Sequence, residues 1–352
     1  MPTFSVRNVH EAYPVMVDWL SRNGIRNTSR NGDVLQAGEP VVISYERPLE
    51  RVVFWPERDA NPFFHLHESL WMLAGRDTVN DLTPFVSRMR TFSDDGETLH
   101  GAYGHRWRRH FETDQLAQIS HNLRDNPSCR RQVLSMWDTN VDFGARSKDI
   151  PCNLQATFQR DPSDPLRLNM TVFNRSNDLV WGALGANAVH FSFLLEWVAL
   201  SSNMMPGKYH QVSANLHAYE DTFQQVLPIV DHLRPVAGGG ITSLYRSNGV
   251  VPSQMDTNTS MLQADLADYW EHWGKDTEFV TDFFRDVAGP MRRMHEIYKE
   301  RVEGKPDYQG ALLFLSTKWK PREDNDWARA AREWVTRRWK QTERAADDGV
   351  QA

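Results

Sequence analysis

The residue in this sequence that is best suited to chemistry is a cysteine. The chain of 352 residues holds two cysteines, Cys129 and Cys152, and the second stands in the segment Asp149–Asn153. A deprotonated thiol is a strong nucleophile and can form a covalent intermediate with a substrate. A single cysteine is nevertheless more often a small apolar core residue, so its neighbours must decide between the two interpretations.

Arginines stand on both sides of this segment. Arg130 and Arg131 precede it, and Arg175 follows it together with Ser176. Guanidinium groups bind phosphate oxygens in bidentate geometry, and their charge favours a thiolate over a thiol. For Arg130 and Arg131 taken alone, a solvated turn after a proline would be the simpler interpretation. Beside a cysteine, the arginines favour a catalytic site for a phosphorylated substrate.

These residues belong to a longer set of motifs that occurs in a fixed order along residues 29–223. The set comprises Ser29–Gly32; His67–Trp71 with Gly75, Asp77 and Thr78; Gly101–Arg108; Ser128–Arg131; Pro151 and Cys152; Asn174–Asp178 with Gly182 and Asn187; and Leu216–Tyr219. In this order the segments resemble those of the thymidylate synthases and the related pyrimidine nucleotide hydroxymethylases. Each segment alone is a weak match, but the ordered set is specific.

The resemblance implies the thymidylate synthase fold. This is an α/β (α+β) fold in which a mixed β-sheet is flanked by helices, and the sheets of two subunits pack back to back in a homodimer. Subunits related by a two-fold axis can share residues between their active sites. The implied partners are a pyrimidine deoxynucleotide monophosphate and a folate, with 5,10-methylenetetrahydrofolate as co-substrate. No metal site is implied.

The resemblance also implies a covalent mechanism. Carbon C5 of a pyrimidine is a poor nucleophile, but addition of the Cys152 thiolate to C6 turns the ring into an enolate whose C5 attacks a one-carbon electrophile. Glu68, in a helix with apolar neighbours, would relay protons and order water near the base. The simpler alternative for Glu68 is an exposed helix residue. Tyr103 would help to remove the proton from C5.

The remaining motifs imply the residues that bind the substrates. The nucleotide-binding residues are, for the phosphate, Arg30, Arg130, Arg131, Arg175 and Ser176; for the base, Asn187; and for the 3′-hydroxyl of the sugar, His217 and Tyr219. Arg130 and Arg131 would come from the neighbouring subunit of the dimer. Asp178 would lie in the folate site. Taken in isolation, His217 would more often be a structural histidine.

The sequence departs from the usual synthase pattern in several places. Asn153 follows the cysteine where a histidine is usual, and the spacing from Asp178 to Asn187 is one residue longer. Met89 and Phe92 stand where tryptophans are expected. The sequence after residue 240 does not resemble the synthase C-terminus, and an apolar tail that closes over the folate is not recognisable. The departures leave the chemistry at the base intact but weaken the case for hydride transfer.

These departures favour one product over another. Methylation and hydroxymethylation share an intermediate with an exocyclic methylene on C5; a dry pocket leads to hydride transfer from the folate, and an admitted water leads to a hydroxymethyl group. Met89, a flexible thioether in place of a rigid ring, favours hydroxymethyl-dUMP over dTMP. The alternative is that Trp107, or a tryptophan of the C-terminal region, fills the same space and the enzyme makes dTMP.

The base is predicted to be uracil. An asparagine side chain both donates and accepts, so Asn187 can pair with O4 and N3–H of uracil. Cytosine presents an amino group and a bare N3, which a carboxyl group matches better. The sequence therefore predicts dUMP as substrate and leaves a dCMP hydroxymethylase as the alternative.

The hydrophobic pattern predicts the elements that must position these segments. Helices are predicted over residues 8–22, 63–73, 115–123 and 188–202, and strands over residues 40–45, 51–55, 132–137, 153–160 and 166–174. Residues 23–32 and the glycine-rich residues 237–243 are predicted to be loops, and the latter lack the lysine motif of a phosphate loop. Residues 327–341 are predicted to form a terminal helix that docks through its tryptophans.

A change of composition near residue 240 divides the chain. We predict a thymidylate synthase-like catalytic domain over residues 1–240 and a mainly helical C-terminal extension of unassigned role over residues 241–352. The net charge is -6, so no global basic field would attract nucleic acid. A family member that has lost catalysis and binds nucleotide or RNA is the competing hypothesis. The presence of the catalytic residues and the negative charge argue against it.

The sequence also predicts where the protein works. Two cysteines are too few for a disulfide-rich secreted scaffold, and the N-terminal residues lack the features of a signal peptide. No apolar run is expected to approach the ~20 residues that span a bilayer. We therefore expect a cytoplasmic enzyme, not bound to membranes, in which Cys152 is a free thiol.

Overall fold

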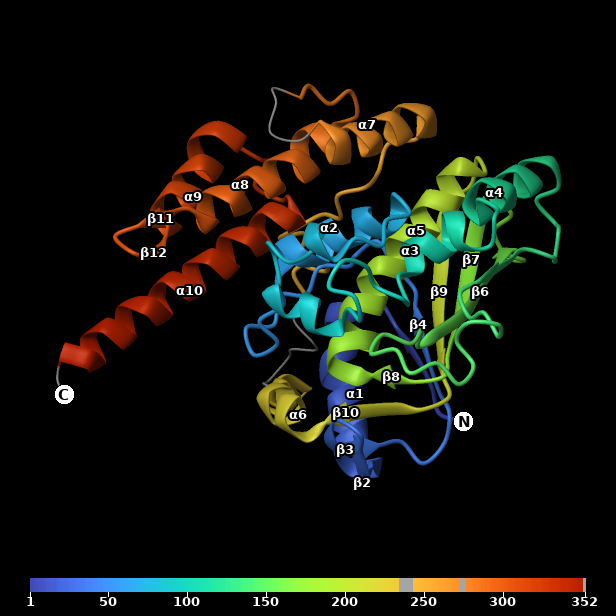
Figure 1. The fold of residues 1–352 in the computed structure, drawn as a ribbon, viewed down its shortest axis with the longest axis horizontal. Coiled ribbons are helices and arrows are strands. Elements are labelled where there is room, and N and C mark those ends of the chain that lie inside the picture. Colours follow the sequence, from blue (N-terminus) through green and yellow to red (C-terminus); the bar gives the residue numbers. More distant parts are fainter. Residues whose placement is uncertain (234–242, 273–276, 351–352) are drawn as a thin grey trace.

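The structure is a computed structural model that describes residues 1–233, 243–272 and 277–350. Its centre is a six-stranded mixed sheet in the order β1-β4-β9-β7-β6-β5, flanked by helices (Figure 1). The pairs β1–β4 and β9–β7 are parallel, and the pairs β4–β9, β7–β6 and β6–β5 are antiparallel. The strands are β1 (Thr3–Val6), β4 (Val41–Tyr45), β5 (Val133–Ser135), β6 (Asn153–Arg160), β7 (Arg167–Asn174) and β9 (Met205–Ser213). The predicted fold class, a mixed sheet flanked by helices, is confirmed.

A second sheet of four strands has the order β2-β3-β10-β8. Its strands are β2 (Ile25–Ser29), β3 (Gly32–Gln36), β8 (Asn177–Asp178) and β10 (Leu216–Tyr219). Strands β2 and β3 form a hairpin, and Gly32 at its turn has φ +121°, a value that favours glycine. Because β3 pairs with β10, the hairpin turn that carries Arg30 comes close to the end of β10.

Ten α-helices cover the sheets in the part of the chain that the structure describes. They are α1 (Val9–Asn23), α2 (Pro62–Leu73), α3 (Tyr103–His105), α4 (Gln115–Asp125), α5 (Asn187–Ser201), α6 (Glu220–Val226), α7 (Thr259–Glu271), α8 (Gly289–Lys299), α9 (Tyr308–Phe314) and α10 (Asp326–Val350). A short ribbon of β11 (Arg301–Val302) and β12 (Lys305–Pro306) joins α8 to α9. The starts of α1, α2 and α4 are capped by Asn8, Asn61 and Asp114, whose side chains accept from backbone amides of the first turn.

Helix α5 is the centre of the core and packs against β7 and β9. Every residue from Ala188 to Ala199 is buried. The stretch Leu179–Ser201 is long and apolar enough to cross a membrane by length and composition, contrary to the sequence expectation, but 83% of its apolar 18-residue window is buried inside the protein. A helix enclosed on all sides by protein needs an apolar surface all round, so its composition is that of a core helix.

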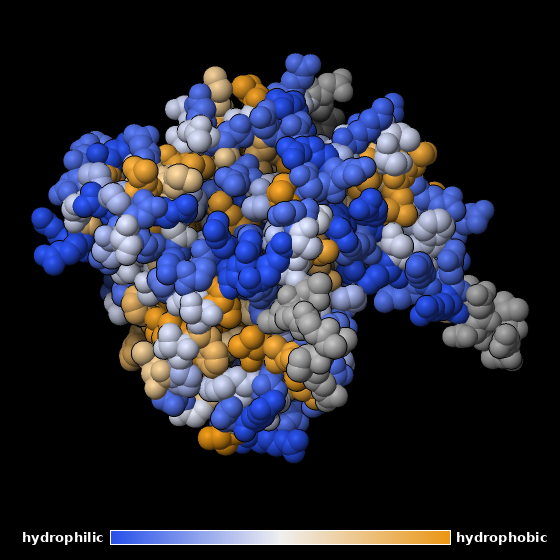
Figure 2. All heavy atoms as spheres, turned by 180° about the vertical axis from the view of Figure 1, so that it is seen from behind, coloured by the Kyte–Doolittle hydropathy of each residue, from blue (hydrophilic) through white to orange (hydrophobic). Residues whose placement is uncertain are grey.

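The face of the large sheet opposite α5 is half-buried. Along β7 the residues alternate between buried and half-buried positions, and Thr171 and Phe173 lie on the half-buried side. On the neighbouring strand β9, His210 and Val212 pair with them on the same side. Seen from behind, hydrophilic side chains cover most of the molecule and apolar side chains gather in its lower half (Figure 2). The sheet therefore has a second face of mixed polarity that could receive another protein surface.

The residues after position 243 pack over α2. Tyr269 of α7 places its hydroxyl 3.0 Å from Nδ1 of His67, and Trp334 of α10 meets the ring of Phe63 edge-on. Trp327 and Trp334 are both buried, so the prediction of a terminal helix docked by its tryptophans is confirmed. Figure 1 shows α8, α9 and α10 side by side, away from the large sheet. The extension thus supports the outer side of helix α2.

Several predicted elements differ from the structure. Residues 25–29, predicted to be part of a loop, form β2; this strand is polar and exposed, so it shows no apolar alternation and is defined by its pairing with β3. Residues 51–55, predicted to be a strand, are buried but form none. Strands β1, β3 and β8 to β12 were not predicted. Of the glycine-rich residues 237–243, all but the last lie outside the described residues.

Candidate active site

Cys152 lies directly before β6, and the side chain of Tyr103 fixes its backbone. The Tyr103 hydroxyl accepts from the backbone N–H groups of Cys152 at 3.0 Å and of Asn153 at 3.2 Å. Burial, followed by the nearby cysteine, raises the pKa of Tyr103 far above its ordinary value, so the phenol stays protonated. Tyr103 is therefore placed beside the nucleophile, as predicted, and it fixes the backbone there.

The electrostatics of Cys152 differ from the sequence expectation. Burial raises the pKa of the Cys152 thiol above its ordinary value, while Arg175 and Arg30 act in the opposite direction. Arg175 thus favours the thiolate, as predicted, and Arg30 adds to its effect, but burial outweighs both. In the free protein the cysteine is consequently held as a thiol at neutral pH.

Arg175, which follows β7, holds the segment of residues 150–152 by hydrogen bonds. Its backbone N–H donates to the Cys152 carbonyl at 2.9 Å. Its Nε donates to the Pro151 carbonyl at 2.8 Å, and its Nη2 donates to the Ile150 carbonyl at 3.1 Å. One edge of the guanidinium group therefore holds the loop, which leaves Nη1 for a phosphate.

A pocket of about 260 Å³ opens beside this segment. It is lined by Ser29, Arg30, Asn31, Val34, Gln36, Arg175, Ser176, Asn215, His217 and Tyr219. Five of the predicted nucleotide-binding residues, Arg30, Arg175, Ser176, His217 and Tyr219, thus line one pocket. The His217 ring lies 3.0 Å from the Asn215 side-chain oxygen, which orients the imidazole. Two arginines and several hydroxyl and amide groups in one polar pocket suit a sugar phosphate.

Arg130 and Arg131 are not part of this pocket. Both are exposed, in the segment between α4 and β5 at the edge of the large sheet. Within one chain they therefore do not join Arg30 and Arg175. Their exposure agrees with a role toward a second subunit, and that role stays a prediction.

The unusually long spacing between Asp178 and Asn187 falls in a π-helical turn. Residues Leu179–Ala186 form this turn, which ends with Gly185 in a non-helical conformation (φ −123°, ψ −115°). A π-turn holds one residue more than the corresponding α-turn, and the longer spacing from Asp178 to Asn187 falls in this segment. Asn187 begins α5, and its side-chain oxygen accepts from Asn153. Its assignment to the base stays a prediction.

Three asparagines form a connected set of hydrogen bonds at this place. Asn153 donates to the Asn187 side-chain oxygen at 3.3 Å, and Asn187 donates to the Asn177 side-chain oxygen at 3.0 Å. Asn177 in turn donates to Gln211 and Ser213, each at 3.0 Å. The set orients the Asn187 amide, and Asn153, the departure from the usual histidine, is part of it. A spacing argument alone did not reveal the roles of Asn153 and Asn177.

Glu68 is buried rather than exposed, so the simpler alternative for it is wrong. It lies on α2 with an exposed fraction of 8%. Its Oε2 atom lies 3.1 Å from Nε2 of His190 on α5. Helices α2 and α5 pack together, which brings the predicted proton-relay carboxylate to the helix that begins with Asn187.

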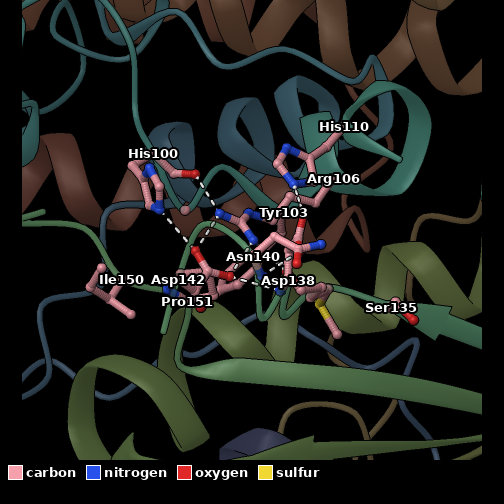
Figure 3. Close-up of polar contacts among 12 residues, drawn as sticks. His100, Tyr103, Arg106, His110, Ser135, Asp138, Asn140, Asp142, Ile150 and Pro151 are labelled. Atoms are coloured by element: carbon pink, nitrogen blue, oxygen red, sulfur yellow. Dashed lines mark hydrogen bonds and ion pairs between the residues drawn. The ribbon is translucent and has the colours of Figure 1, made fainter. Parts of the chain in front are cut away.

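The loop that leads to Cys152 is held by a buried ionic network. The two nitrogens of the Arg106 guanidinium donate to the Asp142 carboxylate at 2.6 Å and 2.8 Å. His100 contacts the same carboxylate at 2.8 Å, and the backbone N–H of Asp138 donates to it at 2.8 Å. Figure 3 shows His100, Arg106 and Asp138 arranged around Asp142, with Tyr103 and Pro151 beside them. The network therefore ties the loop before the nucleophile to the segment that carries Tyr103.

Asp142→Asn should destabilise the protein markedly. The substitution leaves the buried Arg106 without a counter-charge, which costs about 3–5 kcal/mol where a buried pair loses one partner. Arg106 and the other partners overcome burial and lower the pKa of Asp142, so this stability is present above the ordinary carboxyl pKa and is lost as the pH falls. Urea unfolding of both proteins measures the difference. Asp125→Asn, which breaks the exposed pair with His121, is the control and should be nearly neutral; an equal effect of both variants would contradict the role of the network.

The sequence profile of the family described as thymidylate synthase matches residues 16–235, which is more than half of the chain. The chain belongs to the thymidylate synthase family. A protein of Pseudomonas phage M6 named deoxyuridylate hydroxymethyltransferase is 47% identical over 360 aligned positions, which cover 99% of each chain. A protein of the same name from Bacillus phage SP01 is 34% identical and covers 63% of this chain and 60% of its own. The crystal structure of thymidylate synthase from T4 phage matches with a TM-score of 0.52 at 20% identity, covering 65% of this chain and 82% of that one, and supports the fold.

The thymidylate synthase profile ends at residue 235, whereas the match to the phage M6 protein continues through the C-terminal extension. The extension is therefore shared with at least one relative but lies outside the family profile. The division of the chain near residue 240 stays a prediction.

The residue that family resemblance assigns to the folate has an unused oxygen. Asp178 accepts from the backbone N–H of Trp181 through one carboxylate oxygen, and the other is buried without a hydrogen-bond partner. Burial raises the pKa of Asp178 above its ordinary value. The indole of Trp181 is 51% exposed, and the guanidinium carbon of Arg58 lies 4.5 Å from its ring centre. A polar acceptor beside an exposed aromatic ring fits the N–H groups and flat ring of a pterin.

Trp107 does not replace the missing tryptophans at the site. It is fully buried in the core, where its ring packs against Phe191. Met89 is half-buried at the position where a tryptophan was expected. Trp327 packs against Phe193 of α5 and Trp334 packs against Phe63 of α2, so both indoles are engaged in docking the extension.

Proposed function

We propose that this protein is a deoxyuridylate hydroxymethylase that converts dUMP, 5,10-methylenetetrahydrofolate and water to hydroxymethyl-dUMP and tetrahydrofolate. The observation that carries the proposal is the 47% identity, over the full length of both chains, to a phage enzyme of that name. The site supports the class of reaction, because Arg175, one of the two arginines that line the polar pocket, also holds the segment that carries the cysteine. The protein is a one-carbon transferase of the thymidylate synthase family.

The reaction follows from the residues at the site. The Cys152 sulfur adds to C6 of the uracil, and C5 then bonds to the one-carbon unit of the folate. Loss of the C5 proton and cleavage of the bond to the folate leave an exocyclic methylene on C5 and free tetrahydrofolate. Water adds to the methylene, the ring electrons return to form the C5–C6 double bond, and the Cys152 thiolate leaves. Tyr103 holds the backbone at the sulfur throughout.

The phosphate and the sugar would be bound by the polar pocket. Arg30 and Arg175 supply the charge, and His217 with Tyr219 lies where a 3′-hydroxyl could be bound. Asn187 would bind the base, because its amide is oriented by neighbouring asparagines. The pterin of the co-substrate would be bound by Asp178, whose unused oxygen is an acceptor for ring N–H groups.

The protein should act on dUMP in preference to dCMP. Asn187 can offer a donor to O4 and an acceptor to N3–H of uracil, but it cannot donate to N3 and accept from N4 of cytosine with the same fixed orientation. Asn187→Asp should shift the preference toward dCMP, because a protonated carboxyl group matches cytosine. Steady-state kcat/KM values for both nucleotides measure this. A wild-type preference for dCMP would contradict the role of Asn187.

The folate product should be tetrahydrofolate. Hydration of the exocyclic methylene leaves the folate reduced, whereas transfer of a hydride to it would leave dihydrofolate. Absorbance in the dihydrofolate band should therefore stay flat during turnover of dUMP. Dihydrofolate formed in equal amount with dTMP would show that the protein is a thymidylate synthase, which is the second candidate function.

We also propose that the active enzyme is a homodimer joined through the half-buried face of the large sheet. The central positions of this face mix polar and apolar side chains, among them Thr171, Phe173 and Val212. Two copies related by a two-fold axis would cover both faces. The exposed Arg130 and Arg131, at the edge of the same sheet, could then reach the phosphate pocket of the partner.

A further inference from the structure

A buried contact between a histidine and a carboxylate lies one helical turn from Asn187, the asparagine proposed to bind the base. His190 stands three residues after Asn187 on α5, so the two side chains project from the same face of the helix. Nε2 of His190 lies 3.1 Å from Oε2 of Glu68 on α2. The side chains are exposed by only 3% and 10%.

This contact is incomplete as a hydrogen bond. Nε2 of His190 is buried and has no hydrogen-bond partner of good geometry, although the carboxylate oxygen is near it. Among the described residues, no other contact is recorded for the Glu68 carboxylate. Two polar groups that are buried together without being satisfied by one another favour a third polar group between or beside them. A water molecule is the smallest group that fits this requirement.

We propose that His190 is the positioning residue that orients Glu68 and shares its proton when water adds to the exocyclic methylene. This inference rests on the proposed hydroxymethylase function, because a methylating enzyme has no such water. The residue after the nucleophile, Asn153, cannot take up a proton at neutral pH, whereas an imidazole can. The structure thus places an imidazole from α5 beside the carboxylate.

Addition of water releases one proton, which the site must hold until the thiolate leaves. The water oxygen bonds to the methylene carbon, one water proton passes to the Glu68 carboxylate, and the carbon–carbon π electrons move into the ring as an enolate. The enolate expels the Cys152 thiolate and restores the C5–C6 double bond. The proton held between Glu68 and His190 then returns to the thiolate through solvent.

The surroundings of His190 distinguish it from its neighbour His65. The two rings lie 6.4 Å apart between centres, and both are buried. Burial, with Arg58 and His190 adding to the effect, lowers the pKa of His65 well below its ordinary value, so His65 stays neutral. No carboxylate contact is recorded for His65 among the described residues, so it serves as the matched control for a buried histidine on the same interface.

The test compares two steps of one reaction. Release of tritium from C5-labelled dUMP reports the removal of the C5 proton, and hydroxymethyl-dUMP reports the later addition of water. In His190→Gln, product formation should fall on the order of a hundredfold, the scale of an acid–base contribution, and tritium release should fall much less. The accumulating methylene intermediate should then be trapped by an added thiol as a thioether of dUMP.

The other outcomes are also decisive. His65→Gln should keep tritium release and product formation equal, whatever it does to stability. If His190→Gln lowers both rates in parallel, or changes neither, the proposal is wrong. If His190→Gln does not fold, the same ratio is measured with His190→Asn. If the wild-type protein makes dTMP and dihydrofolate, the proposed function is wrong. This outcome is seen with the wild-type protein alone and does not depend on the His190 variants.

Discussion

Replacement of Cys152 by serine should abolish turnover while dUMP binding and assembly persist. A hydroxyl group has a much higher pKa than a thiol, and among the described residues no general base lies within hydrogen-bond distance of the Cys152 sulfur. Serine keeps the backbone contacts to Tyr103 and Arg175, because both are made through main-chain atoms of this segment. The substitution therefore removes the nucleophile and leaves its support.

The measurement is tritium release from C5-labelled dUMP in the presence of the folate, together with dUMP binding by calorimetry. Tritium release depends on addition at C6 and not on the later branch to either product. Cys129→Ser is the matched control, because Cys129 lies between α4 and β5 and does not line the phosphate pocket. A Cys152→Ser enzyme that keeps more than a few per cent of the wild-type rate would show that another group is the nucleophile.

Two inactive variants should restore activity when mixed. If Arg131 reaches the phosphate pocket of the neighbouring subunit, Arg131→Ala should weaken dUMP binding by roughly 1.5–3 kcal/mol, the scale of a charge-assisted hydrogen bond. Cys152→Ala removes the nucleophile of its own subunit. In a heterodimer of the two, one site carries both lesions and the other carries neither, so half of the sites should be active.

Subunit exchange must be shown separately, for example by differently tagged chains. A mixture of Cys152→Ala with Arg175→Ala is the informative comparison. Arg175 contacts the carbonyls of Ile150 and Pro151 in the same chain, so in this heterodimer each site carries one lesion and no activity should be restored. If the double-tagged heterodimer of Cys152→Ala with Arg131→Ala also regains no activity, Arg131 acts within its own subunit or away from the site.

The sequence predicted the elements whose pattern depends on local burial. Helix α5 is a long apolar run, strands β6 and β7 alternate between buried and less buried residues, and all three were predicted within a residue or two of their ends. Strand β2 was missed because its side chains face solvent and its order comes from pairing with β3. Residues 51–55 were predicted to be a strand because they are mostly apolar, but their apolar side chains reflect burial and not strand pairing. The hydrophobic pattern of one strand does not show which distant segment it pairs with.

In the candidate site, too, short motifs could be identified from the sequence, whereas contacts between distant segments could not. The residues of the phosphate pocket could be identified because each lies in a short motif, and the fold brings Arg30 and His217 together through the pairing of β3 with β10. The π-turn before Asn187 could be suspected only as an unexplained spacing. The contacts of Arg106 with Asp142 and of Glu68 with His190 join segments far apart in the chain. Neither had a signal in the sequence, because an arginine or histidine in an apolar stretch does not indicate its partner.

The central claim, that this protein hydroxymethylates dUMP, is tested most directly by the product formed in heavy-oxygen water. Purified protein is given 5,10-methylenetetrahydrofolate and either dUMP or dCMP, and the nucleotide products are identified by mass spectrometry. We predict a hydroxymethyl-dUMP that carries the heavy oxygen from water, together with tetrahydrofolate, and much less product from dCMP. Formation of dTMP without heavy oxygen, together with dihydrofolate, would contradict the account.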